Sequence, residues 1–199
     1  RFALCFPDVY EVGMSHVGSH ILYHILNQRQ DTYCERSYYP WPDAVEILRE
    51  EQVPLATLET ATPLSEFDIV GFTLQHELNF TTVLAMMDLG GIALRADDRH
   101  GPDPICIAGG PCTVNPEPMA PFFDALVIGE GEQVIGEVCD CVKKAGPIVD
   151  EEDRKAALRQ LAQIAGVYVP SVWELKDTGR FVVPKPAGDG PEKVRRRVV

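Results

Sequence analysis

Two glycine-rich segments hold the residue types in this sequence that are best suited to binding a ligand. Each follows an apolar run, and together they contain Gly109, Gly110, Pro111, Thr113, Gly129, Glu130, Gly131 and Glu132. Backbone N–H groups of glycine approach a ligand closely because no Cβ intervenes. If the two apolar runs are parallel strands, both segments lie at the carboxyl edge of one sheet, where ligands of open α/β sheets bind. We therefore predict a ligand site at this edge; the alternative at Gly109-Gly110 is a tight β–α turn that binds nothing.

The two glutamates of the second segment bear on the type of ligand. A helix N-terminus attracts phosphate through its free N–H groups and its dipole, but Glu130 and Glu132 already place negative charge there. Carboxylates are better suited to accept hydrogen bonds from the hydroxyls or amides of a neutral polar ligand. The alternative is that both glutamates only cap the helix and complement its dipole. A nucleotide phosphate is the less favoured ligand.

Composition limits the classes of function open to the chain. Its 199 residues are 45% hydrophobic, which is enough for one sizeable core and an appendage. The net charge of −12 argues against nucleic-acid binding, which needs clustered Lys and Arg, and the basic end Lys193–Val199 is interpreted as a solvated linker. No apolar run approaches the length of a membrane span. Arg1–Tyr10 does not show the charged, apolar and small-residue regions of a signal peptide in that order. It begins directly with a predicted strand, so we expect the chain to be an excised fragment.

Neither the cysteines nor the histidines form a complete metal-binding pattern. The six cysteines lack the spacing of a disulfide framework and suit a reduced cytoplasm, so we expect a cytoplasmic location. His16, His20 and His24 repeat at i, i+4 and i+8 on one flank of a predicted helix. That spacing could bind zinc, but no Glu or Cys is placed to complete a site. We therefore expect these histidines to line the edge of a buried face.

Apolar runs that alternate with amphipathic segments predict the secondary structure. The expected strands are Phe2–Phe6, Tyr33–Arg36, Phe67–Thr73, Pro104–Ala108 and Ala125–Ile128, with Pro54–Thr57 either a further strand or a connector. The expected helices are His16–Gln28 with Ser15 as N-cap, Asp43–Glu51, Glu77–Leu89 and Glu132–Lys144. In the first of these helices, Val17, Ile21 and Ile25 repeat at helical spacing and predict one core-facing stripe.

This alternation predicts a doubly wound α/β domain over residues 1–146, with a parallel sheet and helices on both faces. A smaller extension is expected over residues 147–199. It contains a charged helix at Asp150–Ala165, a small hairpin built from Val167–Val169, Val172–Leu175 and Arg180–Val183, and a linker at Pro184–Pro191.

Several stretches in combination resemble a known family. Ile107–Pro118 and Asp124–Glu132 are similar to the GGP-x-T and D-x-x-x-x-GEGE segments of the cobalamin-binding-like domain that precedes many radical SAM enzyme domains. Asp8–His20 and Phe67–Gln75 resemble an uncharacterised subfamily of these proteins, which carries a radical SAM domain further downstream. Val167–Pro170, together with the basic end, looks like the connection into that domain. The resemblance implies a five-stranded, flavodoxin-like cobalamin-binding fold.

The resemblance also implies which residues line the cofactor site. Beside the two glycine-rich segments, the loops at the sheet edge supply Asp8, Tyr10, Gly13, Ser15, His16, Thr73 and Gln75. Typical cobalamin domains have Asp-x-His-x-x-Gly after the first strand, with the histidine as lower axial ligand of cobalt. Asp8 and Gly13 match this pattern, but Tyr10 occupies the ligand position, and a phenol replaces a neutral imidazole poorly. Either cobalamin binds without a protein ligand on cobalt, or His16 substitutes, or the domain has lost the cofactor.

A second departure concerns catalysis. Radical SAM enzymes use a Cys-x-x-x-Cys-x-x-Cys motif that leaves one iron of a 4Fe–4S cluster open for S-adenosylmethionine, and none of the six cysteines has this spacing. We therefore assign no catalytic residue and no metal ligand to this chain, and expect the cluster and S-adenosylmethionine only in the missing downstream domain.

Two functions follow from these patterns. The favoured one is an accessory cobalamin-binding or cobalamin-like module of a radical SAM enzyme, with the radical SAM domain of the same polypeptide as its partner. The alternative is a cofactor-free interaction domain that packs on and covers that domain. A phospho-receiver is rejected, because it needs an acidic pair after the first strand, where Asp8 is alone, and a lysine where Gly129-Glu130 stands.

Overall fold

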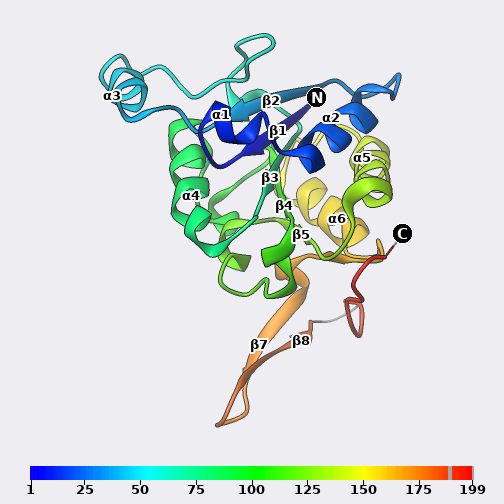
Figure 1. Cartoon of the computed structure of the whole chain (residues 1–199). Helices are drawn as coiled ribbons and strands as arrows, with labels where there is room; N and C mark the ends of the chain where they lie inside the picture. The colour runs from blue at the N-terminus through cyan, green and yellow to red at the C-terminus, as the bar shows by residue number, and fades with distance from the viewer. Residues whose placement is uncertain (188–189, 199) are drawn as a thin grey trace.

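Six strands form the central sheet of the computed structural model, which describes residues 1–187 and 190–198 (Figure 1). Their order across the sheet is β2-β1-β3-β4-β5-β6. The strands are β1 (Phe2–Phe6), β2 (Cys34–Tyr38), β3 (Ile69–Thr73), β4 (Ile105–Gly109), β5 (Ala125–Val127) and β6 (Val167–Tyr168). Strands β1 to β5 are parallel, whereas β6 pairs antiparallel with β5. The predicted α/β class with a mainly parallel sheet is confirmed.

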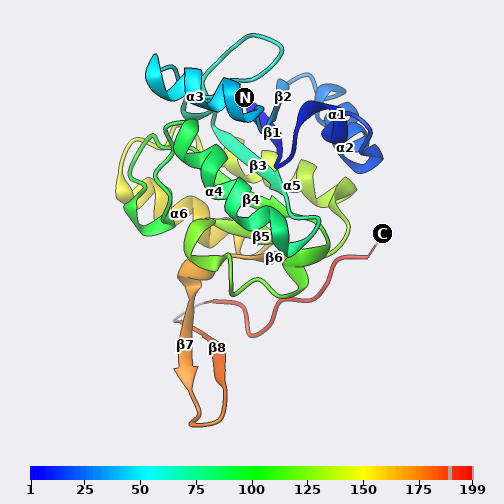
Figure 2. The same ribbon diagram turned by 60° about the vertical axis from the view of Figure 1, so that its left-hand side comes forward.

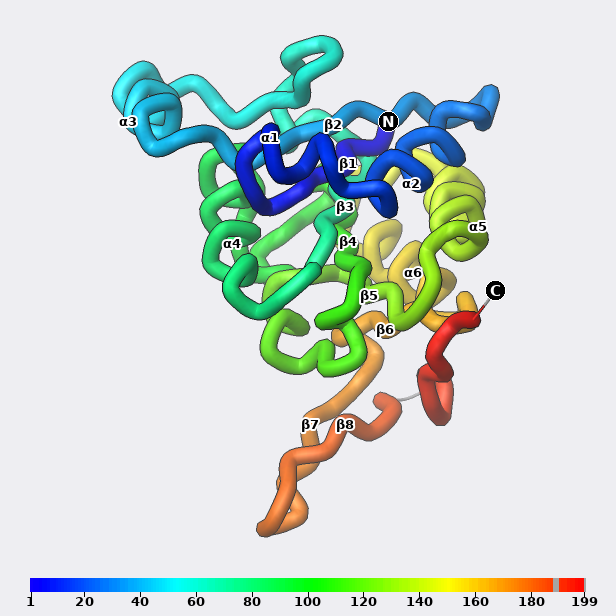
Figure 3. Tube along the Cα trace, in the orientation of Figure 1, coloured from blue at the N-terminus to red at the C-terminus, as the bar shows by residue number. Residues whose placement is uncertain are grey.

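Helices cover both faces of this sheet (Figures 1 and 3). On one face lie α2 (Val17–Asn27), α5 (Gly131–Ala145) and α6 (Glu151–Leu161), and on the other α3 (Pro42–Glu50) and α4 (Phe80–Leu89). The central strands β1, β3, β4 and β5 are buried on both sides and are largely apolar, whereas the outer strand β2 contains Glu35, Arg36 and Ser37. In β1, for example, Phe2 and Leu4 contribute to one core and Ala3 and Cys5 to the other. The short helix α1 (Tyr10–Gly13) follows β1.

The sheet has six strands rather than the five predicted, because Val167–Tyr168 does not join the hairpin that the sequence predicted for it. Helix α6 packs against α5 and returns the chain to the sheet, where β6 adds to the edge of β5. The hairpin contains only β7 (Trp173–Asp177) and β8 (Val182–Pro186), and it projects from the body of the protein (Figure 2). The expected linker therefore begins inside β8, and residues 188–189 of it lie outside the described residues.

The structure decides two other local points. Pro54–Thr57, for which the sequence left a strand or a connector open, is a connector with one isolated bridge between Ala56 and Pro63. The N-cap of α2 is His16 and not Ser15, because the His16 side chain accepts the hydrogen bond from the Ser19 N–H.

The stripe predicted for α2 is also wrong at its beginning. Val17 is 67% exposed and Ile21 41% exposed, while Leu26 is fully buried and Ile25 is partly buried. Only the second half of the helix lies deep against the sheet. The first turns of α2 instead stand at the carboxyl edge of the strands, beside the loops that the sequence marked for binding.

A buried ionic network joins the sheet to α6 and to the loop before β4. Asp124, at the start of β5, accepts hydrogen bonds from Arg99 and from Arg154, the latter at 2.8 Å, and the three side chains are at most 3% exposed. Asp124 also accepts the N–H of Cys106 in β4 at 2.7 Å. One carboxylate faces two guanidiniums, and backbone carbonyl oxygens stabilise the positive charge that remains. Arg99 donates to the carbonyl oxygens of Ala93, Leu94 and Phe122, and Arg154 donates to those of Asp103 and Pro104.

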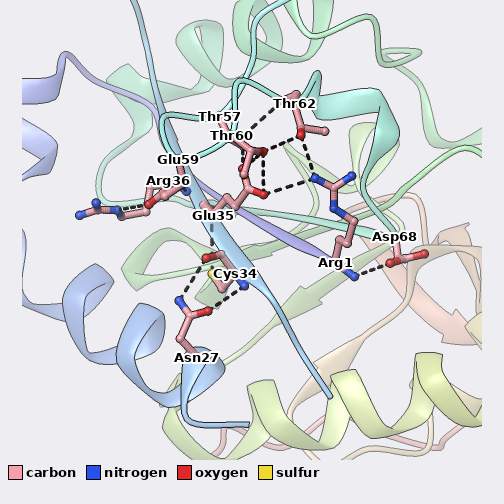
Figure 4. Close-up of polar contacts among 10 residues, drawn as sticks. All are labelled: Arg1, Asn27, Cys34, Glu35, Arg36, Thr57, Glu59, Thr60, Thr62 and Asp68. Atoms are coloured by element: carbon pink, nitrogen blue, oxygen red, sulfur yellow. Dashed lines mark hydrogen bonds and ion pairs between the residues drawn. The ribbon is translucent and has the colours of Figure 1, made fainter. Parts of the chain in front are cut away.

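A second buried carboxylate, Glu35 of β2, holds the long connection between α3 and β3 (Figure 4). Both of its oxygens accept hydrogen bonds from the Thr60 hydroxyl, at 2.9 and 2.7 Å, and the Thr57 hydroxyl donates as well. Burial by itself raises the pKa of Glu35, but these hydrogen bonds and the nearby Arg1 guanidinium outweigh it, and the pKa is lowered. The carboxylate is therefore charged at neutral pH.

The same connection also contacts the backbone of β2. The Glu59 carboxylate accepts the Arg36 N–H at 2.7 Å and the Arg36 Nε at 2.8 Å (Figure 4). The N–H of Leu58 donates to the Arg36 carbonyl oxygen at 2.8 Å. The connection is thus fixed alongside β2 by backbone and side-chain bonds together.

Substituting Asp124 should strongly destabilise the protein. Asp124→Ala leaves two buried guanidiniums without a carboxylate, and we expect a loss of about 3–5 kcal/mol in the free energy of unfolding, measured by urea denaturation. The control is Asp140→Ala, which removes an ion pair with Arg29 in which the aspartate is 65% exposed; its effect should be much smaller. Equal losses in the two variants would contradict the role of the buried network.

Candidate functional site

A cavity of about 200 Å³ lies at the carboxyl edge of the sheet, between the strands and helices α2 and α5. Its floor is apolar and includes Leu4, Ile107 and Val127 from the central strands. Its rim consists of the loops that follow β3, β4 and β5 and the beginning of α2. From the predicted set it brings together His16, Thr73, Gln75, Gly109, Gly110, Gly129, Glu130, Gly131 and Glu132.

One polar side chain in this cavity lacks a hydrogen-bond partner within the described part of the chain. The Oγ1 atom of Thr73, the last residue of β3, is buried and makes no hydrogen bond. Leaving a buried hydroxyl unpaired costs about 1–3 kcal/mol. Thr73 also lines the cavity, so its hydroxyl is a candidate partner for a hydrogen-bonding group of a ligand.

The two glycines after β4 play different roles. A Cβ added to Gly109 would meet nothing within 4 Å, so the absence of a side chain there keeps the cavity open. Gly110 has φ +111°, and a Cβ on it would lie 2.8 Å from the Leu74 carbonyl oxygen. Thus Gly109 leaves space for a ligand, whereas Gly110 is required by the turn itself.

The other two predicted residues of this loop, Pro111 and Thr113, do not line the cavity. Pro111 begins a 3-10 turn over Pro111–Val114. The Thr113 hydroxyl is buried and bonds to the Gly110 carbonyl oxygen at 2.8 Å and to the Val127 carbonyl oxygen at 2.6 Å. It ties the loop after β4 to the end of β5, so its role here is to hold the wall of the cavity.

The loop from β5 to α5 forms another wall. Gly129 has φ +115°, Glu130 is the N-cap of α5, and the helix begins at Gly131. The Glu130 side chain makes no capping hydrogen bond, so the interpretation of this residue as a side-chain cap is not supported. Glu132 lies in the first turn of α5, where its charge complements the helix dipole. Both glutamates border the cavity.

His16 contributes an imidazole to the cavity wall. Its Nδ1 lies 3.1 Å from the Ser19 N–H that it accepts and 2.9 Å from the Ser19 hydroxyl, and its ring packs on Phe6. Burial lowers the pKa of His16, while a hydrogen bond with Gln75 opposes this shift. Because Nδ1 accepts the cap hydrogen bond, the imidazole carries its proton on Nε2, which in this tautomer can donate a hydrogen bond to a ligand but cannot bind a metal ion.

The remaining predicted residues of the first loop lie away from the cavity. Tyr10 is 48% exposed, and its ring makes an edge contact with Tyr38. Asp8 accepts the N–H of Val9, and the Ser15 hydroxyl donates to the Val12 carbonyl oxygen. A Cβ on Gly13 would overlap the Tyr38 ring, at 2.3 Å. These residues shape the first loop rather than the cavity.

Sequence reasoning missed several residues of the cavity, among them Leu4, Gly18, Leu22, Gly71 and Val134. One of them carried a signal, because a glycine inside a strand, such as Gly71, often marks the close approach of another group. In this protein that group is the ring of Phe2, which would lie 2.8 Å from a Cβ. The aliphatic residues carried no signal that separates a cavity floor from an ordinary core.

Two negative findings concern residues 1–187 and 190–198, which the structure describes. Among them, no cluster of three or more His, Cys, Asp or Glu side chains has a geometry that could hold a metal ion. No helix in this part of the chain has the length and apolar character needed to cross a membrane.

The parallel sheet with helices on both faces defines a doubly wound α/β domain, and its cavity lies at the carboxyl ends of the strands. Comparison with known families assigns it further. The chain belongs to the family described as "Radical SAM proteins, N-terminal", which matches residues 18–170.

Comparisons with curated proteins and with solved structures add no closer assignment. A search of curated proteins found no match. Among solved structures, the chain is similar to a radical S-adenosylmethionine methyltransferase, TsrM, from Kitasatospora setae, determined with cobalamin and a 4Fe–4S cluster bound. The identity is 14% and the TM-score 0.48, and the match covers 98% of this chain and 30% of that one. The chain thus spans under a third of the length of that protein.

Two neighbouring glycines offer a matched test of the loop after β4. Gly110→Ala should lower the free energy of unfolding by about 1–3 kcal/mol, because φ is positive and the Leu74 backbone blocks the methyl group. Gly109→Ala meets open space and should leave stability unchanged or raise it by up to about 1 kcal/mol. Urea denaturation measures both, and a loss at Gly109 as large as that at Gly110 would contradict the open cavity.

Proposed function

We propose that this chain is an accessory cobalamin-binding or cobalamin-like module of a radical SAM enzyme. Family membership supplies the radical SAM context. The proposal of a bound cofactor rests on the buried, unpaired Thr73 hydroxyl, which belongs to a glycine-edged cavity at the carboxyl ends of the strands. A cavity of this kind is suited to a largely apolar group with one hydrogen-bonding atom.

The topology supports a flavodoxin-like assignment of the domain. Its parallel strands follow the order β2-β1-β3-β4-β5, which is the order of flavodoxin-like sheets. In such sheets the ligand lies outside the carboxyl ends near the first and third strands, where the strand order reverses. The cavity includes residues of both β1 and β3, namely Leu4 and Thr73.

The residues present fit part of a cobalamin molecule better than they fit its cobalt. The cavity of about 200 Å³ is too small for a corrin ring and would take a smaller portion of the cofactor, with Thr73 bonding to it and Gly109 leaving room. Tyr10 lies outside the cavity, and the His16 imidazole is already engaged by Ser19 and Gln75. We therefore favour binding without a protein ligand on cobalt. When bound, cobalamin would supply a cobalt centre for group transfer or radical chemistry.

The iron–sulfur cluster and S-adenosylmethionine are assigned to another part of the polypeptide. The six cysteines lie on separate elements or, as with Cys139 and Cys141, two residues apart on α5, where side chains do not face each other. We assign the projecting hairpin and the residues that follow it to the connection toward a downstream radical SAM domain, which would be the partner of this module.

A cofactor-free interaction domain is the second candidate, and exposed apolar side chains at the same edge favour it. Loops after β1, β3 and β4 and the start of α2 expose Tyr10, Val12, Val17, Leu78 and Val114, with exposed fractions between 46% and 84%. Large exposed apolar groups mark surfaces that another molecule covers. A downstream domain would cover this edge whether or not a cofactor lies between them.

Titration with hydroxocobalamin, followed by ultraviolet–visible absorption and co-elution in gel filtration, tests the cofactor. We expect binding in the wild-type chain. Thr73→Val keeps the shape but removes the hydroxyl, and it should weaken binding roughly tenfold. The same variant should not lower the stability of the ligand-free protein, because the hydroxyl has no partner there.

Two further variants address the cobalt ligand. Tyr10→Phe should leave the spectrum of the bound cobalamin unchanged. His16→Asn keeps a good N-cap residue, so it should also leave the spectrum unchanged unless His16 is the ligand. Absence of co-elution and of any spectral change in the wild-type chain would overturn the cofactor assignment and leave the interaction domain.

A further inference from the structure

The chain returns, near its C-terminal end, to the loop that forms one wall of the cavity (Figure 3). We call Val194–Val198 the terminal segment. Its Arg197 N–H donates to the Ile128 carbonyl oxygen at 2.7 Å, and the Glu130 N–H donates to the Arg197 carbonyl oxygen at 3.2 Å. Arg197 therefore forms a parallel bridge with Gly129, which lies between these two partners.

Two glycines make room for this contact. A Cβ on Gly129 would lie 2.1 Å from the Arg197 carbonyl oxygen and 2.6 Å from its nitrogen. A Cβ on Gly166, just before β6, would lie 2.9 Å from the Arg197 Cβ. Both glycines have positive φ, of +115° and +88°. No L-residue with a side chain fits at Gly129 while the terminal segment is in place.

The Arg197 side chain adds a charged contact to this backbone bridge. Its guanidinium forms an ion pair with Glu137 of α5 and also approaches the Ala165 carbonyl oxygen, at 3.4 Å. The Arg197 side chain is 20% exposed and that of Glu137 is 42% exposed. By contrast, the neighbouring Arg195 and Arg196 are exposed residues. Of the three consecutive arginines, Arg197 is the one that is partly buried.

Gly129 and Glu130 belong to the bridge with the terminal segment and also to the wall of the cavity. We propose that Arg197 is a positioning residue for the cavity: by seating the terminal segment it fixes the Ile128–Gly131 loop in the form that borders the site. The ligand side of this proposal rests on the proposed function. Seating of the segment and occupancy of the cavity then favour each other.

This coupling is reciprocal by thermodynamic necessity. If a seated segment increases the affinity of the cavity for a ligand by some factor, the bound ligand increases the equilibrium constant for seating of the segment by the same factor. Since the terminal segment continues from the projecting hairpin, the coupling would report occupancy of the cavity to the connection that leaves this domain.

Hydrogen exchange of the ligand-free protein tests the positioning role without a cofactor. Glu137→Gln should accelerate exchange of the Arg197 and Glu130 amides roughly tenfold. It should also accelerate the Ile128 amide, which donates to the Gly166 carbonyl oxygen at 2.7 Å and so reports on the loop rather than on the segment. Acceleration at Arg197 with no change at Ile128 would overturn the proposal.

Two controls separate the ion pair from general effects of charge. Arg196→Ala removes an exposed neighbour and should leave all three amides unchanged. Arg197→Glu and Glu137→Arg should each accelerate exchange, and the double variant, which restores an ion pair of reversed polarity, should recover most of the protection. Failure of the double variant to recover any protection would contradict a positioning role through this ion pair.

The coupling itself is tested with hydroxocobalamin. Saturating ligand should slow Arg197 exchange in the wild-type chain, and Glu137→Gln should weaken binding only in proportion to the seated fraction that it removes. Arg197 exchange that saturating ligand leaves unchanged would overturn the coupling. If the wild-type chain does not bind hydroxocobalamin, the proposed cofactor fails, and the exchange measurements alone decide the positioning role of Arg197.

Discussion

The structure depends on the compensation of charge around Asp124. A single buried carboxylate contacts two buried guanidiniums and a backbone N–H of the neighbouring strand. Through these contacts the start of β5 is joined to β4, to α6 and to the loop that carries Arg99. Since α6 leads into β6, the edge of the sheet and everything that follows it along the chain rest on this network. Buried charges of this kind are tolerated only when each has its partners.

Strands β1, β3, β4 and β5 could be predicted from the sequence because each is a short apolar run followed by a glycine, proline or polar turn. The outer strand β2 contains Glu35, Arg36 and Ser37 and carries a weaker signal. β6 could not be predicted in its place, because a two-residue strand carries almost no periodic signal and its partner is chosen by the packing of α6. The N-cap of α2 was displaced for a related reason. Ser15 has the preferred residue type, but the orientation of the first loop brings His16 to the Ser19 N–H.

The position of the candidate site followed from the glycine patterns, whereas its detailed composition did not. Parallel strands necessarily bring the loops after β4 and β5 to one edge, so Gly109 and Gly129 could be placed together from the sequence. Whether a side chain such as Thr73 or Tyr10 faces into the cavity depends on side-chain packing that no spacing encodes. Tyr10 packs against Tyr38 instead, and the Thr73 hydroxyl is left without a partner.

The connection that lies along β2 has a consequence for how the protein behaves in a crowded solution. β2 is an outer strand of the sheet, and outer strands offer free N–H and carbonyl groups to which other chains add. At the middle of β2 both backbone groups of Arg36 are already engaged, its N–H by Glu59 and its carbonyl oxygen by Leu58. The sheet is thereby closed to strand addition at this position, which protects the protein against edge-to-edge aggregation.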